Sequence, residues 1–343
     1  MRAVVKKRQG FGIDILEVEK PSIQPDEVLI RVSFAGICGS DLHIYEWSEG
    51  YEWLKFPLIP GHEFSGEVVT TGNQVGSVQV GDRVTVSPHV YCGRCYYCRG
   101  GKPNLCREGA LRIGFIRPGA FADFVAVPES SVFVLPENCP LDVAALTEPF
   151  CVALYALETA GSSLGNSVLI VGPGPIGLIL VKTLKYMGIS SLLIAGLTDD
   201  NHRLMLAQSL GADETIRVDK ENLLEVVKNV TQGMGVDTVF EVSGSIEGLT
   251  QAMESVKKGG KIFMIGLFQN PTKFFFTPLV RREIMLQGVF NYTSETWRKA
   301  ISLFTTKKID LSSLITHKIP LGKIEEGFQL LKQKEAVKVL VIP

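Results

Sequence analysis

SVLIVGPGPIGLILVKTLKYMG, residues 167–188, is the stretch from which the fold of this chain is most directly predicted. The run VLIV near its start is typical of a buried strand, and the apolar run after the glycines is long enough for a helix. Between them, the glycines are spaced as G-x-G-x-x-G, which permits a tight turn and a close approach of the backbone to a pyrophosphate. A plain glycine turn could share this spacing, but its place between strand and helix favours a dinucleotide site. The residues expected to contact the dinucleotide there are Gly172, Gly174, Pro175, Ile176 and Gly177.

The pattern of this stretch continues on its carboxyl side. SLLIAG at 191–196, VDTVFEVSG at 236–244 and KIFMIGLF at 261–268 are typical strands, and amphipathic segments such as HRLMLAQSLGAD at 202–213 separate them. Strands that alternate with helices indicate βαβ units and a parallel sheet. We therefore predict a doubly wound Rossmann domain over about residues 148–289.

The amino-terminal part of the chain has a different character. Short extended runs, EVLIRVSFAG at 27–36, GEVVTTG at 66–72 and ADFVAVP at 122–128, are broken by Gly, Pro and Asn. This pattern indicates an all-β body with loops. After about residue 290 the chain carries one more helix and then AVKVLVIP at 336–343, a strand expected to return to the first domain. Residues 1–147 and 290–343 would therefore form one domain, so that the whole is an α/β protein of two domains, as 343 residues suggest.

Composition excludes several classes of function. The chain has 35 Lys and Arg residues against 36 Asp and Glu residues, and no long basic run, so we expect no nucleic-acid partner. The start, MRAVVKKRQG, reaches charge too early for a signal peptide, and no segment has about 18 consecutive apolar residues. We expect a cytoplasmic protein with no membrane partner. Its seven cysteines are then expected to be metal ligands or reduced thiols.

Four cysteines form the sharpest local motif, C-x2-C-x2-C-x7-C, at Cys92, Cys95, Cys98 and Cys106. This spacing lets one loop present four thiolates to a zinc ion. Bacterial iron–sulfur proteins also use two C-x2-C steps, but there the fourth cysteine follows the third at a shorter distance and precedes a proline. We therefore predict zinc. Four thiolates leave no open coordination position, so this zinc would be structural. Cys139 and Cys151 match no motif and are expected to be buried thiols.

A second metal site is suggested by Cys38 in GICGSD, His62 and Glu63 in GHEFSG, and Glu148 in TEP. Each residue alone has an ordinary structural explanation: a core thiol, a loop histidine, or an acid near a helix start. Together they fit a catalytic zinc that binds a substrate oxygen and lowers its pKa, as alcohol oxidation requires.

These motifs give the chain, along nearly its whole length, a resemblance to the zinc-dependent medium-chain dehydrogenase/reductase family. GHEFSGEVV, the four-cysteine loop, PGAFADF, TEP and VGPGPIG occur in the family's order and at its spacing. Within the family the chain resembles the branch of polyol (sorbitol) and threonine 3-dehydrogenases. ICGSDLHIYEW is similar to the threonine enzymes, whereas GVFNY and LITHKIPL look more like the polyol enzymes. The resemblance implies a GroES-like catalytic domain, a Rossmann domain, and a homo-oligomer of two or four chains.

The resemblance also implies residue roles. Cys38 and His62 would be zinc ligands, and Glu63 and Glu148 would bind the metal or exchange with water. The remaining implied roles are Asp41 as the residue that orients His62, and Ser40 and His43 as the relay for the alcohol proton. Two zinc ions per chain are therefore expected. The polyol enzymes tend to have Arg before a Tyr where this chain has Asn291 before Tyr292, which leaves the substrate contacts open.

The expected reaction is hydride transfer between a secondary alcohol, of polyol, sugar-alcohol or sugar-acid type, and NAD(P). L-Threonine is an alternative substrate, and it would need a cationic group near the zinc that the sequence does not identify. A non-catalytic dinucleotide-binding zinc protein is a more remote alternative. The aromatic residues Tyr45, Trp47, Tyr51 and Trp53 could line a pocket or simply pack.

The choice between NAD and NADP should depend on the end of the second Rossmann strand. NAD-preferring proteins have an acidic residue there, about 20 positions after the glycine motif, which binds the ribose hydroxyls. This chain has Gly196, followed by Thr198, His202 and Arg203 as possible donors. Asp199 and Asp200 also follow, and either could replace the missing acid. We expect NADP preference or dual use, with Gly196, Thr198 and Arg203 at the cofactor.

Overall fold

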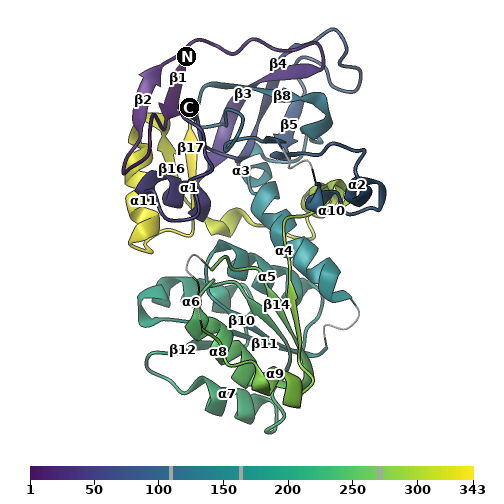
Figure 1. Cartoon of the computed structure of the whole chain (residues 1–343), viewed down its shortest axis with the longest axis vertical. Helices are drawn as coiled ribbons and strands as arrows, with labels where there is room; N and C mark the ends of the chain where they lie inside the picture. Colours follow the sequence, from purple (N-terminus) through teal and green to yellow (C-terminus); the bar gives the residue numbers. More distant parts are fainter. Residues whose placement is uncertain (108–110, 162–164, 269–270, 272) are drawn as a thin grey trace. The chain divides into compact units, whose positions relative to one another are not determined.

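A computed structural model describes residues 1–107, 111–161, 165–268, 271 and 273–343. The chain divides into two compact units, residues 1–151 with 292–343, and residues 152–291 (Figure 1). The limits expected from the sequence lie a few residues from these, and as limits of independent domains they remain a prediction.

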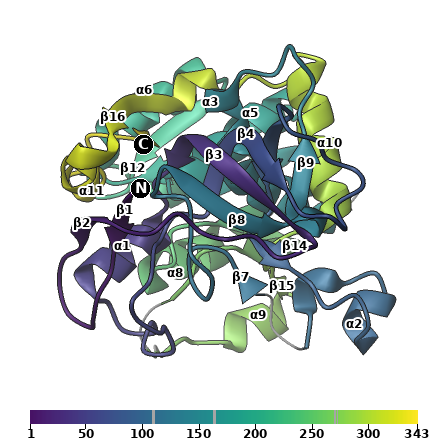
Figure 2. The same cartoon turned by 90° about the horizontal axis from the view of Figure 1, so that it is seen from above.

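The first unit is built on a seven-stranded sheet. Its strand order is β16, β17, β3, β4, β5, β9, and β8 also pairs with β3. Figure 2 shows β3 with its neighbours β4 and β8. The pair β16 and β17 is parallel, and the other pairs are antiparallel. The strands are β3 (Glu27–Gly36), β4 (Glu63–Thr71), β5 (Arg83–Val86), β8 (Phe124–Pro128), β9 (Val132–Val134), β16 (Ile315–Pro320) and β17 (Lys338–Ile342). Because β17 pairs with β3, the expectation that the end of the chain returns to the first domain is confirmed.

Short elements surround this sheet. The smaller strand pairs are β1 (Arg2–Val5) with β2 (Asp14–Glu17), and β6 (His89–Val90) with β7 (Leu111–Arg112). The α-helices are α1 (Gly39–Glu46), α2 (Tyr96–Arg99), α3 (Leu141–Ala144), α4 (Thr147–Ala160), α10 (Ser294–Thr305) and α11 (Ile324–Lys332). The 3-10 turns are η1 (Pro103–Leu105), η2 (Glu129–Ser131), η5 (Ser312–Leu314) and η6 (Leu321–Lys323). The core is formed by alternate residues of the long strands, such as Val28, Ile30 and Val32 of β3.

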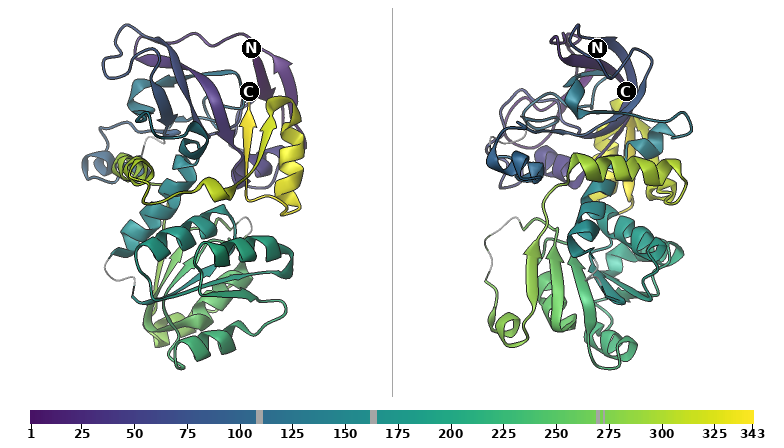
Figure 3. Two further views of the ribbon diagram at one scale, coloured as in Figure 1. Left: turned by 180° about the vertical axis from the view of Figure 1, so that it is seen from behind. Right: turned by 90° about the vertical axis from the view of Figure 1, so that its right-hand side faces the viewer.

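The second unit contains a parallel six-stranded sheet flanked by helices (Figure 3). Its strand order, β12, β11, β10, β13, β14, β15, is the order 3-2-1-4-5-6 of dinucleotide-binding folds. The strands are β10 (Ser167–Val171), β11 (Ser191–Gly196), β12 (Glu214–Arg217), β13 (Val236–Glu241), β14 (Val256–Met264) and β15 (Met285–Gly288). The helices are α5 (Pro175–Tyr186), α6 (Asn201–Ser209), α7 (Leu223–Val230), α8 (Ile246–Ser255) and α9 (Thr277–Arg281), with the 3-10 turn η4 (Thr198–Asp200). This arrangement confirms the predicted fold class.

The three glycines between β10 and α5 meet different constraints. Gly172 has a φ of 112°, a conformation that side chains rarely adopt. A Cβ at Gly177 would overlap the carbonyl oxygen of Gly172, so this glycine lets α5 pack closely against the end of β10. A Cβ at Gly174 would meet no atom within 4 Å. The backbone at Gly174 therefore faces open space, although its φ of −69° suits any residue.

Two further expectations from the sequence concern cysteines and membranes. Cys139 and Cys151 are buried and neither is in a disulfide, as predicted. Among the described residues, no helix is long and apolar enough to cross a membrane. The homo-oligomeric state stays a prediction.

Gly177 and Gly174 provide a matched pair for testing the packing of α5. We predict that Gly177→Ala lowers the free energy of unfolding by about 2 kcal/mol or more, because its methyl group overlaps backbone. Gly174→Ala should change it by less than about 0.5 kcal/mol. Urea unfolding followed by circular dichroism measures both. Equal stability of the two variants would mean that α5 does not approach β10 this closely.

Candidate metal centres and dinucleotide site

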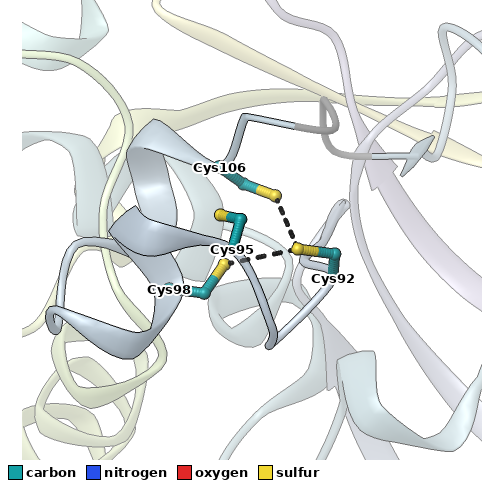
Figure 4. A group of neighbouring side chains, drawn as sticks. All are labelled: Cys92, Cys95, Cys98 and Cys106. Atoms are coloured by element: carbon teal, nitrogen blue, oxygen red, sulfur yellow. Dashed lines mark hydrogen bonds between the residues drawn. The ribbon is translucent and has the colours of Figure 1, made fainter.

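The four cysteines of the predicted zinc loop converge around one point. One sulfur atom from each of Cys92, Cys95, Cys98 and Cys106 lies within 4.8 Å of the others (Figure 4). The Sγ atoms of Cys92 and Cys106 are 3.5 Å apart. The short helix α2 begins after Cys95 and the 3-10 turn η1 ends before Cys106, so the loop doubles back on itself. None of the four is in a disulfide.

The backbone around Cys95 favours its thiolate. Backbone hydrogen bonds from Cys98 and Arg107 lower the pKa of the Cys95 thiol to about 6. Thiolates are the form that binds a metal, and four sulfur donors around one point match tetrahedral zinc. The group fits a closed structural zinc site.

The second group consists of Cys38, His62 and Glu63, whose ligand atoms also lie within 4.8 Å of one another. Cys38 precedes α1, and Glu63 is the first residue of β4. The antiparallel pairing of β3 with β4 places Gly36 opposite Glu63, which brings the two sequence motifs together. A sulfur, an imidazole and a carboxylate in a largely buried setting suit a catalytic zinc, whose ligands leave a position open.

Asp41 connects the parts of this group. One of its carboxylate oxygens accepts a hydrogen bond from the backbone N–H of Cys38 at 3.0 Å. The other accepts one from Gly61 at 3.3 Å and lies 3.6 Å from Nδ1 of His62. Asp41 is buried, and its charge raises the pKa of His62 against the opposing effect of burial. Asp41 is therefore placed where it can orient His62.

Lys338 is a member of the site that sequence reasoning missed. Its Nζ donates to both carboxylate oxygens of Glu63, at 2.8 and 2.7 Å, and to the carbonyl oxygen of Ile37 at 3.2 Å. Lys338 and Glu63 are both buried. Lys338 starts the last strand of the chain, 275 residues from its partner, so no local motif signals the pair.

Glu148 lies outside the three-residue group but faces it. Its carboxylate interacts with the charges of His62 and Glu63, and it accepts a hydrogen bond from the hydroxyl of Tyr292 at 2.9 Å. Burial raises the pKa of Glu148 to about 7. The hydroxyl of Tyr91 in turn donates to the backbone oxygen of Tyr292 at 2.9 Å. Tyr292 is thus a polar partner of Glu148, a role that its sequence position did not reveal.

Ser40 and His43 share the helix α1 and are separated by one turn. Among the described residues, Ser40 Oγ is buried without a hydrogen-bond partner, so its hydroxyl can still bind a group placed there. Nδ1 of His43 lies 3.2 Å from the hydroxyl of Ser48. Burial lowers the pKa of His43, with Glu46 acting in the opposite direction. The imidazole is therefore neutral near pH 7 and can accept a proton.

In the second unit, the glycine motif lies at the point where the strand order reverses. Strand β10 has β11 on one side and β13 on the other, and helices connect them in opposite directions along the sheet. Ligands of such sheets bind at the carboxyl ends of the strands at this point. Gly172, Gly174 and Gly177 follow the end of β10, and Pro175 and Ile176 begin α5. The residues that the sequence predicted thus stand at a helix amino terminus suited to a pyrophosphate.

Glu241, the last residue of β13, shapes the turn beside this motif. One of its oxygens accepts hydrogen bonds from the backbone N–H groups of Ser243 at 2.8 Å and Gly244 at 3.0 Å, and from the Ser243 hydroxyl. The Ser243 hydroxyl lies 3.0 Å from that of Ser245, which caps α8. A Cβ at Gly172 would lie 3.0 Å from the Ser243 nitrogen, so the turn packs against the glycine motif. Sequence reasoning missed Glu241, because the sequence there indicates only a strand followed by a loop.

The end of β11 shows where the candidate specificity residues lie. Asp200 is buried, and its carboxylate accepts from Leu197 N at 3.2 Å and from Arg203 at 3.4 Å. Arg203 is also buried, so its guanidinium lies against Asp200 and not in solvent. The backbone N–H of Thr198 donates to Asp219 at 2.8 Å.

Gly196 itself has a steric reason to be glycine. A Cβ there would lie 2.6 Å from Cγ of Pro173, inside the glycine motif. In the sheet, Gly196 pairs with Arg217 of β12. The Arg217 guanidinium donates to the side-chain oxygen of Asn201 at 2.7 Å, and it is about one third exposed. A cation that the sequence analysis did not consider therefore borders this position.

Comparison with known proteins agrees with both halves of the structure. Residues 24–137 match the model of the alcohol dehydrogenase GroES-like domain, and residues 175–306 match that of the zinc-binding dehydrogenases. L-Threonine 3-dehydrogenase of Bacillus velezensis is 38% identical over 100% of this chain and 99% of its own length.

Two solved structures illustrate the range of similar proteins. 2R,3R-Butanediol dehydrogenase of Bacillus subtilis has a TM-score of 0.89 at 31% identity, and covers 100% of this chain and 99% of its own. Galactitol-1-phosphate dehydrogenase of Escherichia coli has a TM-score of 0.91 at 27% identity and covers 100% of both chains. With its two candidate zinc centres and its dinucleotide-binding sheet, the chain belongs to the zinc-binding medium-chain dehydrogenases and is a zinc-dependent NAD(P) dehydrogenase.

Proposed function

We propose that this enzyme oxidises a secondary alcohol of the polyol, sugar-alcohol or sugar-acid type, and catalyses the reverse reduction. The observation that carries the proposal is the convergence of Cys38, His62 and Glu63 beside the Ser40 and His43 pair. Glu148 would complete the catalytic site, either as a ligand or by exchange with water. The four-cysteine loop would hold a second, structural zinc.

The donor set fits a divalent cation on grounds of charge. Two carboxylates, Glu63 and Glu148, are buried beside the Cys38 sulfur, and Lys338 pairs with only one of them. A bound zinc would supply Lewis-acid polarisation of the hydroxyl oxygen, and the dinucleotide would accept the hydride. A negative charge on Glu63 would weaken the polarisation of the substrate by the metal. Because Lys338 pairs with Glu63, it reduces this effect.

The chain's own residues would then manage the proton. The Ser40 hydroxyl can accept a hydrogen bond from the alcohol and pass the proton towards His43, one helical turn away. The neutral imidazole of His43 can receive it, since burial keeps its pKa low. Tyr292 holds Glu148 by its hydrogen bond, which keeps this carboxylate directed at the same region.

L-Threonine is a second candidate substrate, because the threonine 3-dehydrogenase compared above is similar over the whole chain. Threonine is also a secondary alcohol, so both candidates use the same metal centre and relay. They differ in the charged groups around the reacting carbon.

For the cofactor, we propose that NADP(H) is used at least as well as NAD(H). Support comes from Gly196, which places no acid at the end of β11 itself, and from Arg217 on the adjacent strand. Asp200 is turned inward onto Leu197 and Arg203, so it does not replace the missing acid. Against the proposal, Asp219 lies beside Thr198. Hydrogen bonds from Thr198 lower the pKa of this carboxylate, so it stays ionised and would oppose a phosphate placed next to it.

The two metal sites should separate by mutation. We predict that Cys98→Ser loses one zinc per chain and lowers thermal stability, since it opens a closed structural site. Cys38→Ser should stay folded and bind dinucleotide but lose turnover. Metal analysis, thermal unfolding and dinucleotide titration of both variants test this. Near-normal activity of Cys38→Ser would show that the catalytic assignment is wrong.

The relay predicts a pH-dependent defect. His43→Ala should slow alcohol oxidation by roughly 10²- to 10⁴-fold, the range of general acid–base groups. The loss should be largest at low pH, where hydroxide cannot take the proton instead. Rates from about pH 6 to 9, within which a neutral histidine acts as a base, provide the measurement. A variant whose profile matches the wild type would exclude His43 from the mechanism.

Cofactor choice is tested by kcat/KM for both dinucleotides. The wild type should use NADP(H) at least as well as NAD(H), and Arg217→Leu should lose about tenfold on NADP(H) alone. An acid at position 196 should reverse the preference, but it needs space, so Gly196→Asp is combined with Pro173→Ala. The control is Gly196→Ala with the same Pro173→Ala. A wild type that strongly prefers NAD(H) would contradict the proposal.

A further inference from the structure

A cluster of aromatic side chains stands beside the Cys38, His62 and Glu63 group in the first unit. The Phe115 ring lies 4.9 Å from that of His62 and 6.2 Å from that of Trp53. Tyr51 lies close enough to Cys38 for the thiol's charge to influence its hydroxyl. The charge of His62 influences the pKa of His89. We call Tyr51, Trp53, His89 and Phe115 the aromatic wall.

Arg112 is a positively charged residue next to the aromatic wall. The pairing of β6 with β7 places Arg112 directly opposite His89. Its guanidinium carbon lies 5.6 Å from the centre of the Trp53 ring. Its charge also reaches the hydroxyl of Tyr51. Trp53 and His89 thus lie beside Arg112, and Tyr51 and His89 also interact electrostatically with Cys38 and His62, respectively.

The charge of Arg112 is kept in a setting that shields it from water. Arg112 is partly buried, and burial lowers its pKa, yet a guanidinium remains protonated at any ordinary pH. His89 cannot share the task, because burial, followed by Arg112 and His62, lowers its pKa to about 3. Lys338 donates to both carboxylate oxygens of Glu63, so its charge is already paired. The wall therefore presents a neutral imidazole and a fixed cation side by side.

We propose that Arg112 binds the carboxylate of the substrate. The physiological substrate is therefore a secondary alcohol that carries a carboxylate a few carbons from the reacting hydroxyl, and not a neutral polyol. This inference rests on the proposed function, because it takes the reacting hydroxyl to lie at the Cys38, His62 and Glu63 group. Tyr51 and His89 each interact electrostatically with Arg112 and with a member of that group, and the rings of Phe115 and Trp53 form a chain of contacts from His62 to the guanidinium.

The chemistry of the guanidinium supports a carboxylate in particular. Its planar fork donates two parallel hydrogen bonds to a carboxylate, and the Trp53 ring, 5.6 Å from the guanidinium carbon, adds a cation–π contact. Such charged hydrogen bonds are stronger where water is partly excluded. Both a sugar acid and L-threonine contain this group, and each differs from a neutral polyol in the same way.

The test compares matched substrates in the wild type and in Arg112→Met. The panel pairs a hexonate with the corresponding hexitol, and adds L-threonine and a hexitol phosphate. We expect kcat/KM of the wild type to be higher for the carboxylate of the pair or for L-threonine. Arg112→Met should reduce that value by about 10- to 100-fold, mainly through KM. Its kcat/KM for the hexitol should change less than about twofold, within the range of a neutral substitution.

Controls separate a specific role from a structural one. Arg112→Lys keeps the charge without the fork and should recover part of the activity. Arg99→Gln removes an exposed cation from the neighbouring loop and should have no effect on discrimination. Zinc content and NAD(P)H affinity should be unchanged in Arg112→Met, because neither depends on a substrate carboxylate.

Direct binding keeps this inference distinct from the proposed function. NAD(P)H-loaded protein is titrated calorimetrically with the hexonate, the hexitol, L-threonine and the hexitol phosphate. If no alcohol of the panel is oxidised with either cofactor, the proposed function fails. The Arg112 inference fails if neither carboxylate binds more tightly than the hexitol, or if Arg112→Met loses affinity for acid and alcohol equally. A preference for the phosphate over both carboxylates would also overturn it.

Discussion

The buried ion pair of Glu63 and Lys338 is the interaction on which the catalytic half of the structure depends. Its carboxylate belongs to the first residue of β4 and its ammonium to the first residue of β17, and β3 pairs with both strands. Burying either charge alone is costly, and removal of one partner of such a pair typically costs about 3–5 kcal/mol. The pair therefore links the closing strand of the chain to the metal group. The pair also determines how much negative charge Glu63 would present to a bound metal.

The rest of the group follows from this constraint. Lys338 also donates to the carbonyl oxygen of Ile37, the residue before Cys38. The same ammonium therefore contacts the segment that leads into α1. Asp41, on the first turn of α1, holds the Cys38 backbone and lies beside His62. The positions of these side chains thus depend on contacts between β3, β4, α1 and β17. A change in the register of β17 would move Lys338 away from both of its partners.

How much of this could be predicted from the sequence depends on the distance over which each signal extends. The four-cysteine loop and the glycine motif are local patterns, because one loop or one turn contains all their residues. The fold class followed from the alternation of strands and helices, which is also local. The zinc ligands of the second group lie farther apart, and they were found through the resemblance to a family whose order of motifs the chain shares.

Contacts between distant residues left no such signal. Lys338 is an ordinary lysine in KVLVI until β17 pairs with β3, and Tyr292 reaches Glu148 only when the chain has returned to the first unit. Gly196 was interpreted as a missing acid, but the structure adds that Pro173 occupies the space of a side chain. Arg203 was expected at the cofactor, yet it packs against Asp200, because the 3-10 turn after β11 directs Asp200 inward. Each outcome depends on tertiary packing that a single sequence does not show.

The four-cysteine loop has a consequence for substrate recognition that its closed coordination conceals. His89 and Val90 form β6 just before Cys92, and β7 with Arg112 follows Cys106, so the loop is enclosed by a two-strand pair. A pair of two-residue strands is too short to hold its own register in water. Four thiolates gathered on one ion would close the loop and fix the two strands against each other. The structural zinc would then keep Arg112 opposite His89, and it would act on the reaction through the placement of that cation while never touching the substrate.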